Sequence, residues 1–156
     1  MAYDEATEPI VQLFDDLVRC ETRLYNALGE SLRTEHGLAM SQFELLRYFR
    51  DHPDSRVAEV AANFAAGIGA ISKGVDRLEL RGWIARRPNP ADGRSSLVSL
   101  TEAGSHLVAQ AEGTFRDRLA DLLTSVLGPI GIGATGKALS ALRAALERDR
   151  VGLPVG

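Results

Sequence analysis

A polar face with hydrogen-bond donors at helical spacing lies within residues 68–78. If this segment is a helix, its apolar positions share one side: Ile68, Ile71, Val75 and Leu78. The opposite side then carries Gly69, Ser72, Lys73 and Asp76, with Arg77 at its edge. Hydroxyl, ammonium and guanidinium groups read base edges in the major groove of DNA, and glycine lets the backbone approach a duplex. The segment therefore predicts a base-reading helix; the alternative is an amphipathic helix with a solvated face.

A second basic group follows in the chain. Arg86 and Arg87 lead into the turn-forming run NPADGRS (89–95), which contains Asp92 and Arg94. An arginine at the tip of a β-hairpin can enter a minor groove, whose narrow walls concentrate negative potential. We expect Arg94 to make such a contact and the Asp92 carboxylate to orient its guanidinium. A solvent-exposed arginine beside an Asp–Gly turn is the alternative.

The residue types that enzymes and metal sites use are scattered. Cys20 is the only cysteine, so the chain can form neither an intrachain disulfide nor a cysteine-based zinc cluster. His36, His52 and His106 have no helical pairing, and no nucleophile or cofactor motif is present. We expect no catalytic residue, no metal and no cofactor. Cys20 is expected to behave as a small apolar residue, with redox sensing as the alternative.

The elements that would position these groups begin with a long helix over residues 9–35. Pro9 stands in its first turn and Gly37 follows its end. Its apolar residues keep helical spacing: Ile10, Leu13, Phe14, Leu17, Leu24, Leu28 and Leu32.

A second helix is predicted from Ser41, with Glu44 completing a capping box, and it should end before His52 and Pro53. Its buried residues would be Phe43, Leu46 and either Phe49 or Tyr48. Aromatic and basic residues of this region could also line a ligand pocket, although core packing explains them equally well: Tyr25, Phe43, Arg47 and Tyr48.

Two short helices joined by a tight turn come next. One face of the first helix carries Val57, Val60, Ala61 and Phe64, and the turn is Ala65-Ala66-Gly67. The second helix starts at Ile68 and is closed by Gly82. The period of the apolar residues then changes from helical to alternating. Residues 83–87, ended by Pro88, and residues 96–100 therefore predict the two strands of a hairpin.

The C-terminal third is helical again. Thr101 can cap a helix from Glu102 to about Leu127, the run GPIGIGATG (128–136) would break it, and a last helix would span 137–149. The first helix and the last two are longer than a compact core can cover, so a monomer would expose a large apolar patch. We expect a single domain in which residues 1–37 and 105–156 are dimerisation helices and residues 38–104 form a DNA-binding lobe.

Composition and charge agree with this organisation. The chain has 156 residues, of which 45% are hydrophobic and 25% charged, as in soluble globular proteins. No apolar run approaches the ~18–20 residues that cross a bilayer, and the acidic N-terminus does not resemble a signal peptide. We expect a cytoplasmic protein with no membrane partner. The net charge is −3, but residues 55–100 hold seven Lys or Arg against four Asp or Glu.

The run RGWIARRPNPADGRSSLVSLTEAG (81–104) resembles the wing and the following helix start of the MarR (multiple-antibiotic-resistance) family of regulators. Twelve residues fit the family pattern at fixed spacing: Gly82, Trp83, Ile84, Arg86, Asn89, Pro90, Asp92, Arg94, Val98, Leu100, Thr101 and Gly104. VDRLE (75–79) is similar to the end of the family's recognition helix. Ser41-Gln42-Phe43 with Leu45-Leu46 is similar to its second helix.

The resemblance implies a mainly α fold with a small β-hairpin wing: a winged helix-turn-helix homodimer with interleaved outer helices. It implies a pseudo-palindromic double-stranded DNA operator and repression relieved by a small, often phenolic or otherwise aromatic, effector or by oxidation. The matched DNA contacts would be Ser72, Lys73, Arg77, and Arg94 with Asp92. Many family members have Asp where this chain has Gly67, so we expect the recognition helix to lack a side-chain cap. A winged helix that binds another protein is the second interpretation, and an enzyme is the third.

Overall fold

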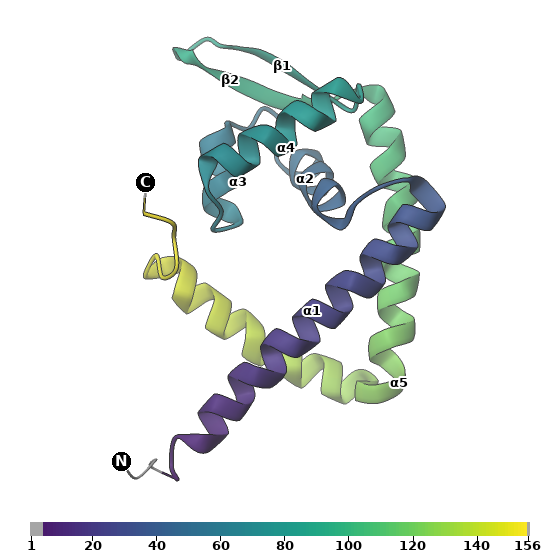
Figure 1. Ribbon diagram of the computed structural model, residues 1–156, viewed down its shortest axis with the longest axis vertical. Coiled ribbons are helices and arrows are strands. Elements are labelled where there is room, and N and C mark those ends of the chain that lie inside the picture. Colours follow the sequence, from purple (N-terminus) through teal and green to yellow (C-terminus); the bar gives the residue numbers. More distant parts are fainter. Residues whose placement is uncertain (1–4, 156) are drawn as a thin grey trace.

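Two long helices and a small lobe at one end of them make up the computed structural model, which describes residues 5–155 (Figure 1). In chain order the elements are α1 (Glu8–His36), α2 (Met40–Asp51), α3 (Val57–Asn63), α4 (Ile68–Leu80), β1 (Ile84–Asn89), β2 (Asp92–Leu100) and α5 (Glu102–Arg148). This order confirms the mainly α fold with one antiparallel hairpin.

The first helix, α1, begins with Pro9 in its first turn and ends at Gly37, as predicted. Gly37 has a φ of 65°, a left-handed backbone that glycine adopts without a Cβ clash. The residues that α1 buries all lie near its C-terminal end: Leu28, Gly29 and Leu32. The N-terminal part of the predicted stripe is open to solvent, since Ile10 and Phe14 are 66% and 64% exposed.

The start of α2 differs from the prediction. The helix begins one residue earlier, so Ser41 lies inside its first turn and does not cap it. Instead, the Gln42 side chain accepts a hydrogen bond from the backbone amide of Ala39 (3.0 Å). Glu44 lies beyond the capping position, which Gln42 occupies, and its carboxylate accepts a hydrogen bond from the Tyr25 hydroxyl on α1.

The core of the lobe forms where α2, α4 and the hairpin meet the N-terminal half of α5. From α2, Phe43, Leu46 and Phe49 are at most 1% exposed, whereas Tyr48 is only half-buried. The rings of Phe43 and Phe115 on α5 pack with their centroids 5.0 Å apart. This contact joins the lobe to the long C-terminal helix.

The short helices α3 and α4 form the predicted helix-turn-helix. Ala65 in the turn has a positive φ of 49°. The side of α4 that carries Ile71, Val75 and Leu78 is buried as predicted, but Ile68 is 61% exposed. Ile68 is the first residue of α4 and extends past the core that covers Ile71 one turn later.

The hairpin is regular over most of its length. Its paired positions run from Ile84 with Leu100 to Asn89 with Asp92. Pro88 does not end the first strand as predicted; it lies within β1 opposite Ser96. A ribbon of two strands tolerates proline because each strand is an edge and needs no second set of ladder hydrogen bonds.

The start of α5 is fixed tightly to the end of the lobe. The Gly104 amide donates to the Thr101 hydroxyl oxygen (3.1 Å), which confirms the predicted cap. The Thr101 hydroxyl donates in turn to the carbonyl of Gly82 (2.7 Å). Gly104 lies so close to Trp83 that a Cβ at this position would overlap the tryptophan carbonyl oxygen.

The glycine-rich run 128–136 separates two helices, as predicted, but the break is one sharp bend and does not extend over the whole run. The bend is at Gly128, with φ 62° and ψ 175°, and helix resumes at Pro129. Proline suits the first position of a helix because its φ is fixed near the helical value and its missing N–H would have no partner there. The later glycines of the run therefore remain helical.

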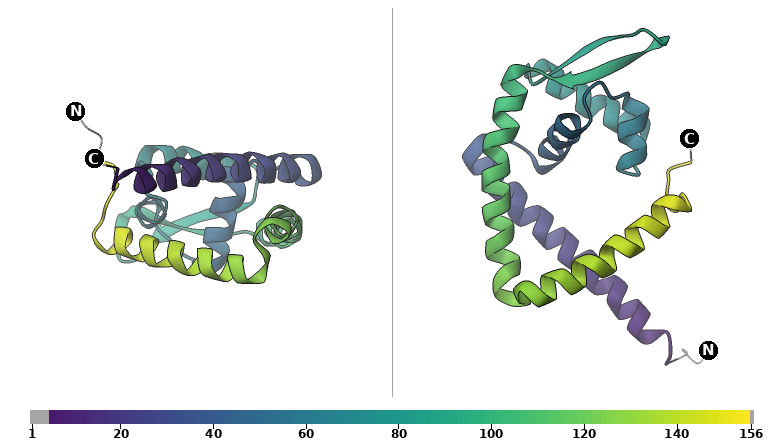
Figure 2. Two further views of the ribbon diagram at one scale, coloured as in Figure 1. Left: turned by 90° about the horizontal axis from the view of Figure 1, so that it is seen from below. Right: turned by 180° about the vertical axis from the view of Figure 1, so that it is seen from behind.

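The two long helices leave the lobe and extend far beyond it, as Figure 2 shows from behind. Residues 8–27 of α1 and 116–148 of α5 are all described, and none of them is buried. Contrary to the expectation from the sequence, α5 contains an 18-residue stretch apolar enough to span a membrane, none of which is buried in the protomer. A helix that packs against a partner presents the same kind of surface.

Candidate nucleic-acid interface

The exposed side of α4 carries the residues that the sequence predicted for it. Gly69, Lys73 and Arg77 are exposed and Ser72 is half-buried, while the opposite side of the helix packs in the core. All four are therefore accessible, and Arg77 lies at the edge of this side, where it lines a cavity between α4 and α2.

The first turn of α4 is open at its backbone. Gly67 precedes the helix and provides no side-chain hydrogen bond, as expected for a glycine at this position. The first helical bond is made by the Ile71 amide to the Gly67 carbonyl (3.2 Å). A Cβ placed on Gly69 would meet no atom within 4 Å. This end of the helix thus offers backbone amides with little side chain around them.

The segment 55–100 contains seven lysines and arginines, and the structure describes all of them. They fall into two groups. Four are engaged within the protein, by an acidic partner or by the Trp83 ring: Arg56, Arg81, Arg86 and Arg87. The other three side chains have no ion pair, hydrogen bond or ring partner within the described part of the chain: Lys73, Arg77 and Arg94. Cations without an internal partner can offer their full charge to a polyanion, and these three are the basic residues predicted to contact DNA.

Arg86 connects the hairpin to α4. Its guanidinium lies 2.7 Å from the Asp76 carboxylate and 3.2 Å from that of Glu79, both on α4. Asp76, predicted on the exposed face of the helix, is thus occupied by an internal ion pair. The contact fixes how the hairpin stands relative to α4.

The base of the hairpin is tied to the loop between α2 and α3. Arg87 binds the Asp54 carboxylate at 3.0–3.1 Å, and the Ser99 hydroxyl donates to the same carboxylate (2.8 Å). Hydrogen bonds from Arg87 and Ser99 hold the pKa of Asp54 below its ordinary value. Ser55 and Val98 exchange two backbone hydrogen bonds beside this group.

The tip of the hairpin is tighter than predicted. The strands are joined at Pro90 and Ala91, so Asp92 already belongs to β2. The Asp92 carboxylate accepts a hydrogen bond from the backbone amide of Arg94 (3.0 Å) and makes none with its guanidinium. The expectation that Asp92 orients the guanidinium is therefore wrong; it shapes the backbone and leaves the exposed Arg94 side chain free.

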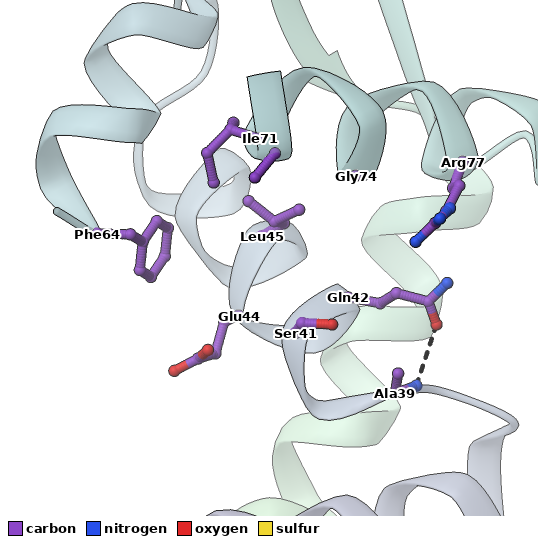
Figure 3. A pocket seen from close by; sticks show the side chains of 10 residues that line it. Ala39, Ser41, Gln42, Glu44, Leu45, Phe64, Ile71, Gly74 and Arg77 are labelled. Atoms are coloured by element: carbon purple, nitrogen blue, oxygen red, sulfur yellow. Dashed lines mark hydrogen bonds between the residues drawn. The ribbon is translucent and has the colours of Figure 1, made fainter. Parts of the chain in front are cut away.

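A cavity of about 430 Å³ lies beside α4, between this helix and the start of α2. Figure 3 shows Arg77 pointing from α4 toward Gln42 and Ser41 of α2 across this space, with Phe64 at the other end. No pattern in the sequence indicated the cavity, because its walls come from segments whose approach depends on tertiary packing.

The Tyr25 hydroxyl donates to the carboxylate of Glu44 over 3.3 Å between α1 and α2. Burial, and then the neighbouring Glu44, raise the pKa of Tyr25 to about 12. Burial also raises the pKa of Glu44, against the opposing effects of Tyr25 and Arg47. This pair is a half-buried polar contact between the long helix and the lobe.

A second polar group joins α2 to α5 around one carboxylate. Glu112 is only 12% exposed and binds Arg50 and Arg116 at 3.1 Å each. Arg47 lies 3.2 Å from the same carboxylate, and its guanidinium stacks 4.7 Å from the centre of the Phe115 ring. Such a group holds the lobe and α5 together by charge as well as by apolar packing.

A larger cavity, of about 820 Å³, lies between the α3–α4 turn, α1 and the second half of α5. Its walls include Leu17, Leu142 and Leu146 beside Arg143 and Arg150. Neither cavity is lined by Tyr25, Phe43, Arg47 or Tyr48, the residues considered for a pocket from the sequence.

The remaining reactive residues are dispersed. The described residues contain no group of three or more His, Cys, Asp or Glu that could hold a metal ion. His36 is bonded to the Thr114 hydroxyl (2.7 Å), which also donates to Glu35. Cys20 is exposed on α1.

Comparison with known proteins points to one family. A model of the MarR family matches residues 38–96. The multiple antibiotic resistance protein MarR of Escherichia coli is 31% identical over 90 residues, which cover 58% of this chain and 62% of that protein. The HTH-type transcriptional regulator YxaD of Bacillus subtilis is 30% identical over 96 residues, or 62% of this chain and 67% of that one. The matches thus span only about three fifths to two thirds of these relatives.

The similarity in structure extends further than the similarity in sequence. A variant of Escherichia coli MarR, solved in complex with operator DNA, superposes with a TM-score of 0.78 at 26% identity. The match covers 90% of this chain and 99% of that one, so it includes the long outer helices as well as the lobe.

Proposed function

The chain belongs to the MarR family, whose members are transcription regulators and not enzymes; on this premise we propose that it binds double-stranded DNA specifically and represses transcription. The residues proposed to contact DNA are Gly69, Ser72, Lys73, Arg77, Asp92 and Arg94. Asp92 acts through the backbone of the hairpin tip, because it bonds the Arg94 amide. The cytoplasm is the compartment in which such a regulator meets its operator.

The observation that carries this proposal is the division of the basic residues. Of the cations in residues 55–100, those without an internal partner lie on the exposed side of α4 or beside the hairpin tip. A recognition helix reads the major groove with such groups, and a basic wing reaches the adjacent minor groove. The internally paired arginines hold the hairpin in place and leave these cations to the DNA.

A mobility-shift titration against the DNA upstream of the protein's own gene tests the proposal. The matched control is a duplex of equal length and composition with a scrambled sequence. Specific binding of the family's kind exceeds non-specific binding by roughly 10³-fold or more at physiological salt. Equal affinity for both duplexes, or none for either, would contradict specific recognition and favour a winged helix that binds another protein.

The operator we propose is pseudo-palindromic and is bound by a homodimer. Residues 38–104 would form the DNA-binding lobe, and residues 1–37 and 105–156 would pair with a second copy. The exposed apolar residues of α1 and of the second half of α5 support this division, since soluble monomers rarely carry such a surface. A two-fold pair would set two α4 helices ~34–36 Å apart, one turn of DNA.

Release by a small aromatic effector completes the proposal. The 820 Å³ cavity supports it, because it lies between the lobe and the long helices and combines leucines with two arginines. An effector there must bind the DNA-incompetent arrangement more tightly, since equal affinity for both states shifts nothing. A panel of simple phenols and benzoates should include a compound that lowers operator affinity in the titration above. If no compound does, repression relieved by this class of effector is wrong, while DNA binding stands on its own test.

A further inference from the structure

Two large apolar side chains in the lobe are left uncovered. Between residues 38 and 104, all of them described, only Ile68 and Leu80 are large, apolar and exposed, at 61% and 88%. Both belong to α4. The other exposed large apolar residues lie in α1, in α5 or after it, where a second copy of the chain is proposed to cover them. Neither the core of the lobe nor the proposed second copy covers Ile68 and Leu80 on α4.

Ile68 stands alone at its end of the helix. It is the first residue of α4, and the neighbouring Gly67, Gly69 and Ala70 are exposed and nearly without side chain. A Cβ on either glycine would meet no atom within 4 Å. Ile68 therefore projects from an open backbone surface, one helical turn before Ser72 and on the same flank.

The major groove offers one apolar feature to such a side chain. The edges of guanine, cytosine and adenine present only donors and acceptors there, whereas thymine adds a C5-methyl group. The N-terminal residues of a recognition helix are the ones that reach base edges. An isoleucine placed against a polar edge would strip water from donors or acceptors without replacing their hydrogen bonds. Only a thymine methyl group would take Ile68 without this cost.

We propose that Ile68 is a specificity-determining residue that contacts the C5-methyl group of a thymine in each half-site. The inference rests on the proposed function and adds a sequence preference to it: an A·T pair, with thymine on a defined strand, opposite the first turn of α4. Leu80 lies twelve residues further along α4, at its C-terminal end, and has no such role.

Deoxyuridine provides the test, because it pairs as thymine does but lacks the methyl group. The bound upstream duplex is amplified once with dTTP and once with dUTP, and both products are titrated with the full-length chain. Removing one buried methyl group should weaken binding about threefold to fivefold per half-site. Ile68→Ala should bind both duplexes with the same, reduced affinity. Leu80→Ala removes the same number of carbon atoms from a more exposed position of the same helix and should keep the full preference for thymine.

The outcomes separate the two proposals. Equal affinity of the unchanged chain for the two duplexes overturns the role of Ile68, as does a uracil effect that persists undiminished in Ile68→Ala. Loss of the preference in Leu80→Ala overturns it as well, because the contact would then not be local to the first turn. Absence of specific binding to the dTTP duplex is a failure of the proposed function. Because Ile68 is exposed, circular dichroism of Ile68→Ala should match that of the unchanged chain.

Discussion

Ser72 and Lys73 place a hydroxyl and an ammonium group on the accessible side of α4, and the core does not need either. Replacing both with alanine should leave the buried side of the helix unchanged, so circular dichroism and thermal unfolding should barely differ. Each good base contact contributes ~1–3 kcal/mol, so specific binding should weaken by tenfold or more in a mobility-shift titration. Lys137→Ala, which removes a charge from the second half of α5, is the matched control. Unchanged affinity of the double variant would remove these residues from the interface.

The half-buried Glu44 carboxylate should make the stability of the protein depend on pH. Its pKa is raised, chiefly by burial, so the folded state binds the proton more tightly than the unfolded chain does. The ionised carboxylate therefore lowers stability at pH 7, and this effect fades as the pH falls through the raised pKa toward the ordinary value of 4.5. Glu44→Gln keeps an acceptor for Tyr25 and removes the charge. Its Tm should exceed that of the unchanged chain at pH 7, and the difference should vanish below pH 4.5.

Thermal unfolding over a pH series measures this difference. Tyr25→Phe is the opposite case, because it leaves the Glu44 carboxylate without its donor and should lower the Tm at pH 7. A lower Tm of Glu44→Gln at pH 7 would contradict this prediction. It would show that the hydrogen bond from Tyr25 stabilises the ionised carboxylate by more than burial destabilises it.

Local patterns were enough to predict that Lys73, Arg77 and Arg94 are accessible, because each lies at a defined position of a helix or hairpin. The partners of Arg86 and Glu44 were not predictable, since they lie on other elements and meet only after packing. Ile68 was assigned to the buried side because periodicity gives the angle around a helix axis. It gives no information on whether the core extends as far as the first turn.

Among the elements, the hairpin should act on DNA through charge. Arg94→Ala removes a free cation near its tip and should reduce the slope of log K against log salt by about one unit for each phosphate that the arginine neutralises in each subunit. Arg87→Ala is the matched control, because this arginine is bound to Asp54 and should change the slope less. Titrations at several salt concentrations measure both. An unaltered slope and affinity for Arg94→Ala would make this arginine a solvated side chain.

The close approach of Gly104 to Trp83, where the hairpin meets α5, should make stability sensitive to a side chain at residue 104. Gly104→Ala would drive a Cβ into the carbonyl of Trp83. Forced backbone shifts of this kind cost ~1–3 kcal/mol, so the Tm should fall by roughly 2–10 °C for a domain of this size. Gly113 is also in α5 but faces open space, so Gly113→Ala should raise the Tm slightly through helix propensity. Equal Tm changes in the two variants would contradict a close approach specific to Gly104.

Where apolar residues keep helical spacing over many turns, as in α1 and the first part of α5, the helix ends were predicted to within a few residues. The Thr101 cap was also confirmed. The errors fall where two local signals compete. Gln42 rather than Ser41 supports the start of α2, because the chain turns one residue earlier. The break after Leu127 was predicted, but the last helix begins at Pro129 and not at residue 137, because proline suits the first turn of a helix.

For the whole molecule, the exposed faces of α1 and α5 predict a dimer in the absence of DNA. The chain has a mass of 16.8 kDa, and light scattering at micromolar concentration should give twice that value. Phe14→Glu and Ile130→Glu place charges on these faces, where Phe14 and Ile130 are 64% and 89% exposed. They should shift the mass toward the monomer and weaken operator binding. A monomer that partitions into lipid vesicles would instead assign the apolar stretch of α5 to a membrane.

One consequence follows from the way α5 leaves the lobe. Between Thr101 and Gly128 the chain is one uninterrupted helix. The number of residues in it therefore sets both the distance and the rotation of the last helix relative to the lobe. A single inserted residue would turn everything beyond the bend by ~100° and advance it by ~1.5 Å. An insertion of seven would restore the orientation to within ~20°. Natural variation in the length of this helix should therefore occur only in steps close to whole turns.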